Sequence, residues 1–87
     1  METAEIAKAL RQYIVERYAI PEADKDFTDD VHLFDYGYVD SFGAVDLVAF
    51  VETTFGIKVT QGDMIAYPMN TINEIAEFTS LRQKGEI

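Results

Sequence analysis

The stretch DSFGAVDLVAFVETTFG, residues 40–56, decides the fold, because its apolar residues recur with the ~3.6-residue period of a helix. At about 100° per residue they form one stripe, made of Ala44, Leu47, Val48, Val51 and Phe55. We assign this stripe to the core and expect a helix over residues 41–55. Gly56 then stands just past the helix end, where glycine takes a positive φ without penalty.

The same helix has a second, mixed face. Phe42, Val45 and Ala49 fall on another side of the helical wheel, beside Asp46 and Glu52. This face combines apolar and acidic groups, which distinguishes it from the core stripe.

Two further full helices are expected. Ile6, Leu10 and Ile14 stand at helical spacing within a segment that Pro21 stops, which predicts a helix over about residues 3–18. Near the other end, Thr71 followed by Glu74 has the spacing of a capping box, and it predicts a helix over residues 72–83.

A short helix and a long loop complete the chain. Thr60 and Asp63 also have capping-box spacing, which indicates a single turn or short helix before Pro68. Residues 21–40 show no sustained period, and connections longer than about 12–15 residues are usually functional or disordered. We expect Val31, Leu33 and Phe34 to attach this loop to the core.

The predicted fold is therefore all-α: a small four-helix bundle of three longer helices and one short helix, with the long loop between the first two. No strand pattern and no internal repeat is present, and 87 residues fit one domain spanning residues 1–87. The predicted core consists of Ile6, Leu10, Ile14, Leu47, Val51, Phe55, Ile72, Ile75 and Phe78.

Composition and charge exclude several classes of function. The net charge of -9 opposes binding to nucleic acid, and no apolar run is long enough to span a membrane. Residues 22–63 contain ten acidic residues against Lys25 and Lys58, so this segment would attract a basic partner surface. The absence of cysteine excludes disulfides, thiolate metal sites and a cysteine nucleophile, and favours a reducing, cytoplasmic setting.

Ser41, at the start of the central helix, allows three interpretations. Asp40 or Ser41 can be an ordinary N-cap that accepts a hydrogen bond from a free backbone N–H. A hydrolase nucleophile is disfavoured, because the frame lacks the first glycine of G-x-S-x-G and His32 is the one available base. The third interpretation is a modified serine, because a helix N-terminus is a natural seat for a phosphate.

A calcium-binding loop is an alternative from a different class. Positions 1, 3, 5, 7, 9 and 12 of a calcium-loop frame would be occupied by Asp24, Asp26, Thr28, Asp30, His32 and Asp35. Position 6 is Asp29 where the turn requires glycine, and Asp35 replaces the usual glutamate. A solvated acidic loop is the simpler interpretation.

The segment LFDYGYVDSFGAVDLVAFVETTFGIKV resembles the second-helix region of the acyl carrier protein family. The matching positions are Gly37, Asp40, Ser41, Phe42, Asp46, Leu47, Val48, Glu52, Phe55, Ile57 and Val59. The resemblance implies a four-helix carrier, not an enzyme, with 4'-phosphopantetheine from coenzyme A attached covalently at Ser41. Asp40 would help to place the serine, and no metal site is implied in the chain itself.

The resemblance also implies partners and a docking surface. The partners would be a phosphopantetheinyl transferase, a ligase that loads an acyl or aminoacyl group, and downstream synthases or transferases with basic docking patches, meeting a monomeric carrier. The docking residues would be Asp35, Phe42, Val45, Asp46, Ala49, Glu52 and Asp63. For each acid, ordinary solvated polarity is an equal alternative, and Val45 and Ala49 could simply pack against the third element.

Phe42 and Gly43 depart from the Leu-acidic pair that follows the serine in many acyl carriers. The DSFG stretch is similar to D-alanyl carrier proteins and other specialised carriers. The cargo could therefore be a fatty acyl group, a polyketide unit or an amino acid.

Overall fold

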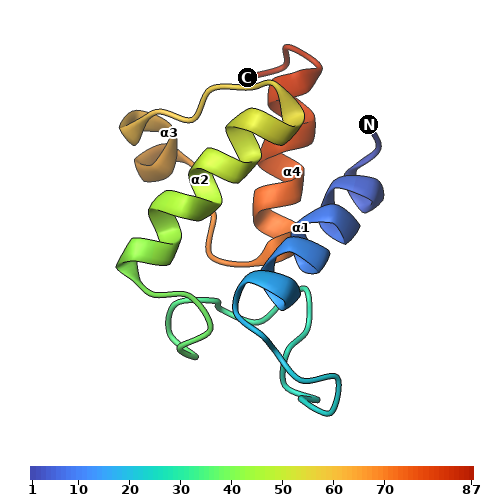
Figure 1. Ribbon diagram of the computed structural model, residues 1–87. Coiled ribbons are helices and arrows are strands. Elements are labelled where there is room, and N and C mark those ends of the chain that lie inside the picture. The colour runs from blue at the N-terminus through green and yellow to red at the C-terminus, as the bar shows by residue number, and fades with distance from the viewer.

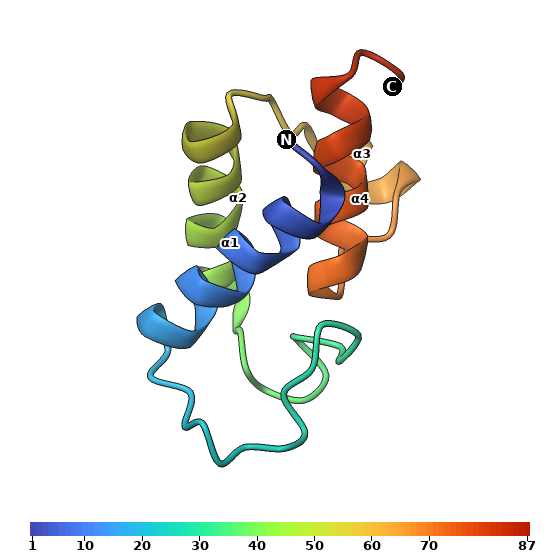
Figure 2. The ribbon, with the colours of Figure 1, turned by 90° about the vertical axis from the view of Figure 1, so that its right-hand side faces the viewer.

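The computed structural model describes residues 1–87 and contains four helices and no strands (Figure 1). The helices are α1 (Thr3–Arg17), α2 (Ser41–Phe55), α3 (Gln61–Ala66) and α4 (Ile72–Gln83). The predicted all-α fold is confirmed, including its three longer helices and one short helix. α1 and α4 make the most extensive helix–helix contact, and Figure 2 shows α1 running obliquely from beside α4 toward the start of α2.

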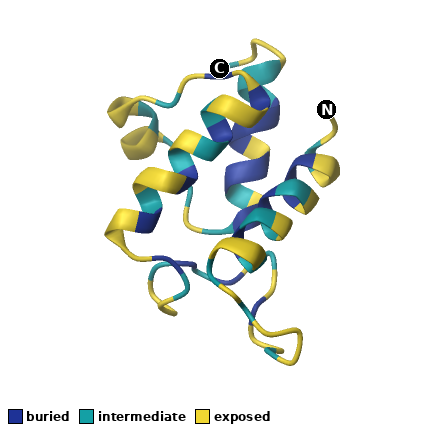
Figure 3. Cartoon of the chain, viewed as in Figure 1, coloured by how far each residue is buried: buried dark blue, intermediate teal, exposed yellow.

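The core lies where α1, α2 and α4 meet, and all nine predicted core residues are buried. Seven further hydrophobic residues belong to the same cluster: Ala7, Phe27, Val31, Leu33, Val39, Ile57 and Ala76. At the edge of the core, the Tyr13 ring on α1 stacks on the Phe50 ring of α2 with centroids 4.0 Å apart. Figure 3 shows the buried side of each long helix turned inward and the exposed side outward.

The helix ends follow the predicted local signals. Thr60 with Asp63 and Thr71 with Glu74 both form complete capping boxes, and Gly56 adopts a left-handed conformation with φ 69°. α1 ends at Arg17, ahead of Pro21, because the chain turns at Ala19, which has φ 51°. Pro21 therefore lies beyond the turn that ends the helix.

The long loop between α1 and α2 contributes four residues to the core. Phe27, Val31, Leu33 and Val39 are all buried, and Leu33 is completely inaccessible. The Leu33 N–H also donates to the Asn70 carbonyl at 2.8 Å, which ties the loop to the segment before α4. Attachment of the loop is confirmed at all three predicted residues: Val31 and Leu33 are buried, and Phe34 is partly buried and packs against the core.

α3 differs from the other helices because none of its residues is buried. In Figure 3 it is the element at the upper left, beside α2, and its outer surface is exposed. No helix in the chain has both the length and the apolar character needed to cross a membrane.

Candidate functional site

Ser41 is the first residue of α2 and is exposed to solvent. Asp40, not Ser41, is the N-cap: its Oδ1 accepts a hydrogen bond from the Gly43 N–H at 2.8 Å. The Asp40 carbonyl also accepts the Ala44 N–H at 2.9 Å. Because Asp40 performs the capping, the Ser41 hydroxyl is left accessible at the positive end of the helix dipole.

Gly43 is required by the close packing of α1 against the first turn of α2. A Cβ at this position would collide with the Tyr18 hydroxyl and approach Val39 Cγ1 to 2.9 Å. The Tyr18 hydroxyl is buried without a hydrogen-bond partner, and burial raises its pKa above the usual value for tyrosine. Sequence reasoning noted Gly43 only as a lost acidic residue; its packing role depends on Tyr18, which lies 25 positions earlier in the printed sequence.

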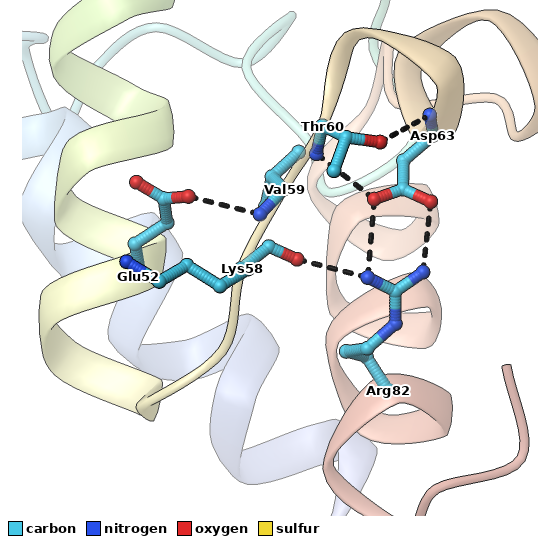
Figure 4. Close-up of polar contacts among 6 residues, drawn as sticks. All are labelled: Glu52, Lys58, Val59, Thr60, Asp63 and Arg82. Carbon is cyan, nitrogen blue, oxygen red and sulfur yellow. Dashed lines mark hydrogen bonds and ion pairs between the residues drawn. The ribbon is translucent and has the colours of Figure 1, made fainter.

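The predicted acidic docking residues on α2 and α3 all have partners within the chain. Asp46 Oδ2 lies 3.1 Å from Arg17 Nη2 on α1. Glu52 Oε2 accepts the backbone N–H of Val59 at 2.9 Å, at the start of the segment that leads to α3 (Figure 4). Asp63 Oδ1 lies 2.8 Å from Arg82 Nη2 on α4.

Arg82 on α4 holds α3 through a two-pronged ion pair with Asp63 (Figure 4). The Nη–Oδ distances are 2.8 and 3.1 Å, and Arg82 Nη1 also donates to the Lys58 carbonyl at 2.9 Å. Hydrogen bonding from Arg82, aided by the Thr60 N–H at 2.9 Å, holds the pKa of Asp63 well below its usual range. Asp63 therefore has a structural role in addition to the docking role predicted for it.

The other predicted docking residues are exposed but not gathered into one acidic patch. Phe42, Val45 and Ala49 lie on the solvent side of α2. Asp35 belongs to the loop, where its N–H donates to His32 Nδ1 at 3.0 Å and its carboxylate stays largely exposed. A partner that covers Ser41 would thus meet large apolar side chains on α2.

An apolar groove of about 490 Å³ runs between α2, α3 and the segment before α4. Thirteen of its fifteen lining residues are hydrophobic, among them Ala44 and Val48 on α2 and Met64 and Ile65 on α3. Ile75 and Phe78 of α4 also line it. Ala44 and Val48, which were assigned to the core, are only partly buried because they face this groove.

The loop does not have the arrangement that a calcium site requires. Asp24 accepts hydrogen bonds from the Asp26 N–H and the Tyr38 hydroxyl, whereas Asp29 pairs with Arg11 at 3.0 Å. Asp30 accepts from the Asn73 amide at 2.7 Å. No three acidic or histidine side chains converge in the chain, so the structure gives no support to the calcium-loop interpretation.

Comparison with known proteins agrees with this geometry. The family described as "Phosphopantetheine attachment site" matches residues 8–79. The D-alanyl carrier protein of Streptococcus uberis is 38% identical over 69 residues, which cover 72% of this chain and 87% of that protein. The D-alanyl carrier protein of Streptococcus pyogenes serotype M5 is 35% identical over 69 residues, with the same coverage of both chains.

The four-helix fold and the family match over residues 8–79 thus define the class of protein, a carrier domain. The chain belongs to the phosphopantetheine-attachment family, and its cofactor is covalent 4'-phosphopantetheine.

The residues around Ser41 fit this cofactor. Ser41 is exposed, and its hydroxyl takes no part in capping the helix. The helix N-terminus favours the negative charge of a phosphodiester. The apolar groove beside α2 offers room for an attached chain.

Proposed function

We propose that this protein is a carrier rather than an enzyme, and that Ser41 is the attachment point of the phosphopantetheine arm. One observation carries the assignment of the residue. Ser41 is exposed at the first position of α2 while Asp40 performs the capping, so its hydroxyl is available for modification. When bound, the arm supplies the thiol that holds cargo as a thioester. The chain has no cysteine and therefore no thiol of its own.

Each residue of the site has a defined task in this proposal. The Ser41 Oγ loses its proton to the transferase and forms a bond to the pantetheine-side phosphorus of the coenzyme A pyrophosphate. The bond from that phosphorus to the bridging oxygen breaks, and adenosine 3',5'-bisphosphate leaves with that oxygen. Asp40 fixes the first turn of α2, so that the hydroxyl and the free end of the helix stay in one orientation. Because Gly43 has no Cβ, Tyr18 at the end of α1 can pack closely against the first turn of α2.

Two classes of cargo have separate support. The named relatives are D-alanyl carrier proteins, which supports an aminoacyl cargo. The apolar groove between α2 and α3 supports an acyl cargo with an apolar chain, of the kind used in fatty acid or polyketide biosynthesis. In either case a ligase would load the arm and a synthase or transferase would receive the cargo.

The test is to isolate the protein from the cells that produce it and to treat it with neutral hydroxylamine, which cleaves thioesters. We expect the intact mass to fall by the mass of the cargo while the arm stays on the protein. The mass of the released hydroxamate then separates an amino acid from an apolar acyl group. Protein that carries the arm but never a hydroxylamine-labile group would contradict the carrier function.

A further inference from the structure

Gly43 lies inside the first turn of α2, although its backbone does not need the conformational freedom of glycine. It is helical, and the glycines that take a positive φ are Gly37, Gly56 and Gly85. Glycine within a helix is less favourable than alanine, because it loses more backbone freedom on folding. The reason for a glycine at this position therefore lies outside α2.

That reason is the fit of Tyr18, the C-cap residue of α1, against the turn. A Cβ on Gly43 would collide with the Tyr18 hydroxyl and would lie 3.1 Å from Tyr18 Cζ. It would also lie 2.9 Å from Cγ1 of Val39, which is buried. The end of the Tyr18 ring thus fills the space that a side chain at position 43 would need.

The hydroxyl of Tyr18 is buried and has no hydrogen-bond partner. Burying a hydroxyl in this way costs free energy, and a phenylalanine ring would avoid the cost. Stability alone therefore does not explain a tyrosine here. The hydroxyl lengthens the ring, so that its tip reaches the space beside the Gly43 Cα.

Tyr18 is itself held firmly at the end of α1. Its N–H donates to the Ile14 carbonyl at 3.0 Å, and the chain turns away at Ala19, which has φ 51°. The Arg17 guanidinium carbon lies 5.4 Å from the centre of the Tyr18 ring, and Arg17 also pairs with Asp46, about one turn beyond Gly43. The end of α1 therefore contacts the first two turns of α2.

Tyr18 lies behind the turn that presents Ser41. At about 100° per residue, Gly43 stands about 200° from Ser41 around the helix axis, so the two residues are on nearly opposite sides. Ser41 is exposed, whereas Gly43 is buried. An enzyme that reaches the Ser41 hydroxyl from solvent meets the side of the turn that Tyr18 does not contact.

Resting on the proposed function, we infer that Tyr18 is a positioning residue for transfer of the phosphopantetheine arm: it supports the first turn of α2 from behind and fixes the direction in which Ser41 presents its hydroxyl. Gly43 is the matching half of this contact, because glycine alone leaves the space that the Tyr18 hydroxyl fills. Transfer requires the serine oxygen to align with a phosphorus atom, and a displacement of about 1 Å can cost about a hundredfold in rate. A turn that loses this support therefore reacts more slowly, while the surface that binds the transferase remains.

The first experiment compares two tyrosines that contact α2 at different places. Tyr18 meets the first turn, whereas Tyr13 stacks on Phe50, more than two turns beyond Ser41. With saturating coenzyme A and a broad-specificity transferase, kcat and KM for the unmodified chain are obtained from the intact mass. Tyr18→Ala should lower kcat about tenfold with KM changed less than about twofold. Tyr13→Ala should leave kcat within about twofold, at a temperature where circular dichroism shows both variants to be folded.

A second readout does not depend on transfer. In NMR spectra of the unmodified chain, the amide signal of Ser41 should shift in Tyr18→Ala and stay in place in Tyr13→Ala. This result would show that the turn has moved before any enzyme binds it.

A double-variant cycle tests the fit between the two residues. Gly43→Ala should lower kcat about tenfold in the wild-type background, because the added methyl group collides with Tyr18. In the Tyr18→Phe background the same change should cost less than about threefold, since the atom nearest to the new Cβ is gone. If Tyr18→Ala does not fold, this cycle decides.

Three results would contradict these expectations. If Tyr13→Ala lowers kcat as much as Tyr18→Ala, or if Tyr18→Ala keeps the wild-type kcat, Tyr18 has no positioning role. If Gly43→Ala costs the same in both backgrounds, the collision is with Val39 and the inference is overturned. A wild-type chain that receives no arm from several transferases would overturn the proposed function, and this inference with it.

Discussion

The loop before α2 and the short helix α3 reverse the usual relation between regular structure and burial. The loop has no regular secondary structure, yet it places Phe27, Val31, Leu33 and Val39 in the core. α3 is a regular helix, yet none of its residues is buried, and polar contacts from Arg82 and Glu52 hold its segment. The loop is therefore a fixed part of the scaffold, whereas α3 is an attached element whose position depends on a few polar bonds.

This difference matters because the two regions flank the functional serine. The buried loop ends at Val39 and delivers Asp40 to the start of α2, so it fixes the position of Ser41. α3 borders the apolar groove beside α2, where Met64 and Ile65 line it. We therefore expect α3 to be released more easily than the loop that holds the start of α2.

The largest expected effect comes from removing buried volume from the loop. Leu33→Ala should lower the free energy of unfolding by about 2–5 kcal/mol, because the side chain is completely buried and a cavity would remain. Urea denaturation followed by circular dichroism measures this change. A loss well below 1 kcal/mol would show that the loop is not part of the scaffold.

A second change should act on α3 alone. Arg82→Ala removes the ion pair to Asp63 and the bond to the Lys58 carbonyl, so amides of residues 58–66 should exchange about tenfold faster. Exchange in α1 and the first turns of α4 should be unchanged. Lys84→Ala is the matched control, because Lys84 is exposed and makes no ion pair. Equal acceleration throughout the chain would mean that α3 is not a separately held element.

Acid should release α3 before the loop. The pKa of Asp63 is held well below its ordinary value in the folded chain, so its ion pair contributes fully above about pH 4. The stabilisation by this ion pair falls as the pH drops below about 4 toward the lowered pKa of Asp63. NMR signals of α3 should then lose their helical shifts while those of α1 persist. In Asp63→Asn this acid-dependent step should be missing, and its persistence there would refute the assignment to Asp63.

High pH should destabilise the loop, with a smaller effect than the acid-dependent release of α3. Burial, together with the hydrogen bond to Asp24, raises the pKa of Tyr38 to about 12. The neutral phenol is favoured in the folded chain, so this contribution is complete below about pH 10 and is lost as the pH rises toward 12. In Tyr38→Phe, the free energy of unfolding should fall less between about pH 10 and about pH 12 than in the wild-type chain. An identical alkaline profile in both proteins would exclude Tyr38 as its source.

The sequence predicted what depends on local signals. Helical period, capping boxes and Gly56 placed the three longer helices almost to the residue and the short helix before Pro68, because these signals act within a few positions of the chain. Phe27 and Val39 were missed as core residues, because a loop has no period that marks which side chains turn inward.

The candidate site shows the same limit. Ser41 and Asp40 were identified from their position before the helix, and the structure decided which of them caps it. The partners of Asp46 and Asp63 were not predicted, because Arg17 and Arg82 lie 29 and 19 positions away in sequence. Pairing over such separations is set by how the helices pack, which a local pattern does not reveal.

The most direct test of the account is whether Ser41 alone receives the arm. The unmodified chain is incubated with coenzyme A, Mg²⁺ and a phosphopantetheinyl transferase, and its intact mass and the modified peptide are determined. We predict one phosphopantetheine adduct on the wild-type chain, mapped to Ser41, and none on Ser41→Ala, whose fold should be kept because Asp40 supplies the cap. An adduct that persists in Ser41→Ala, or a wild-type chain that several transferases leave unmodified, would contradict the account.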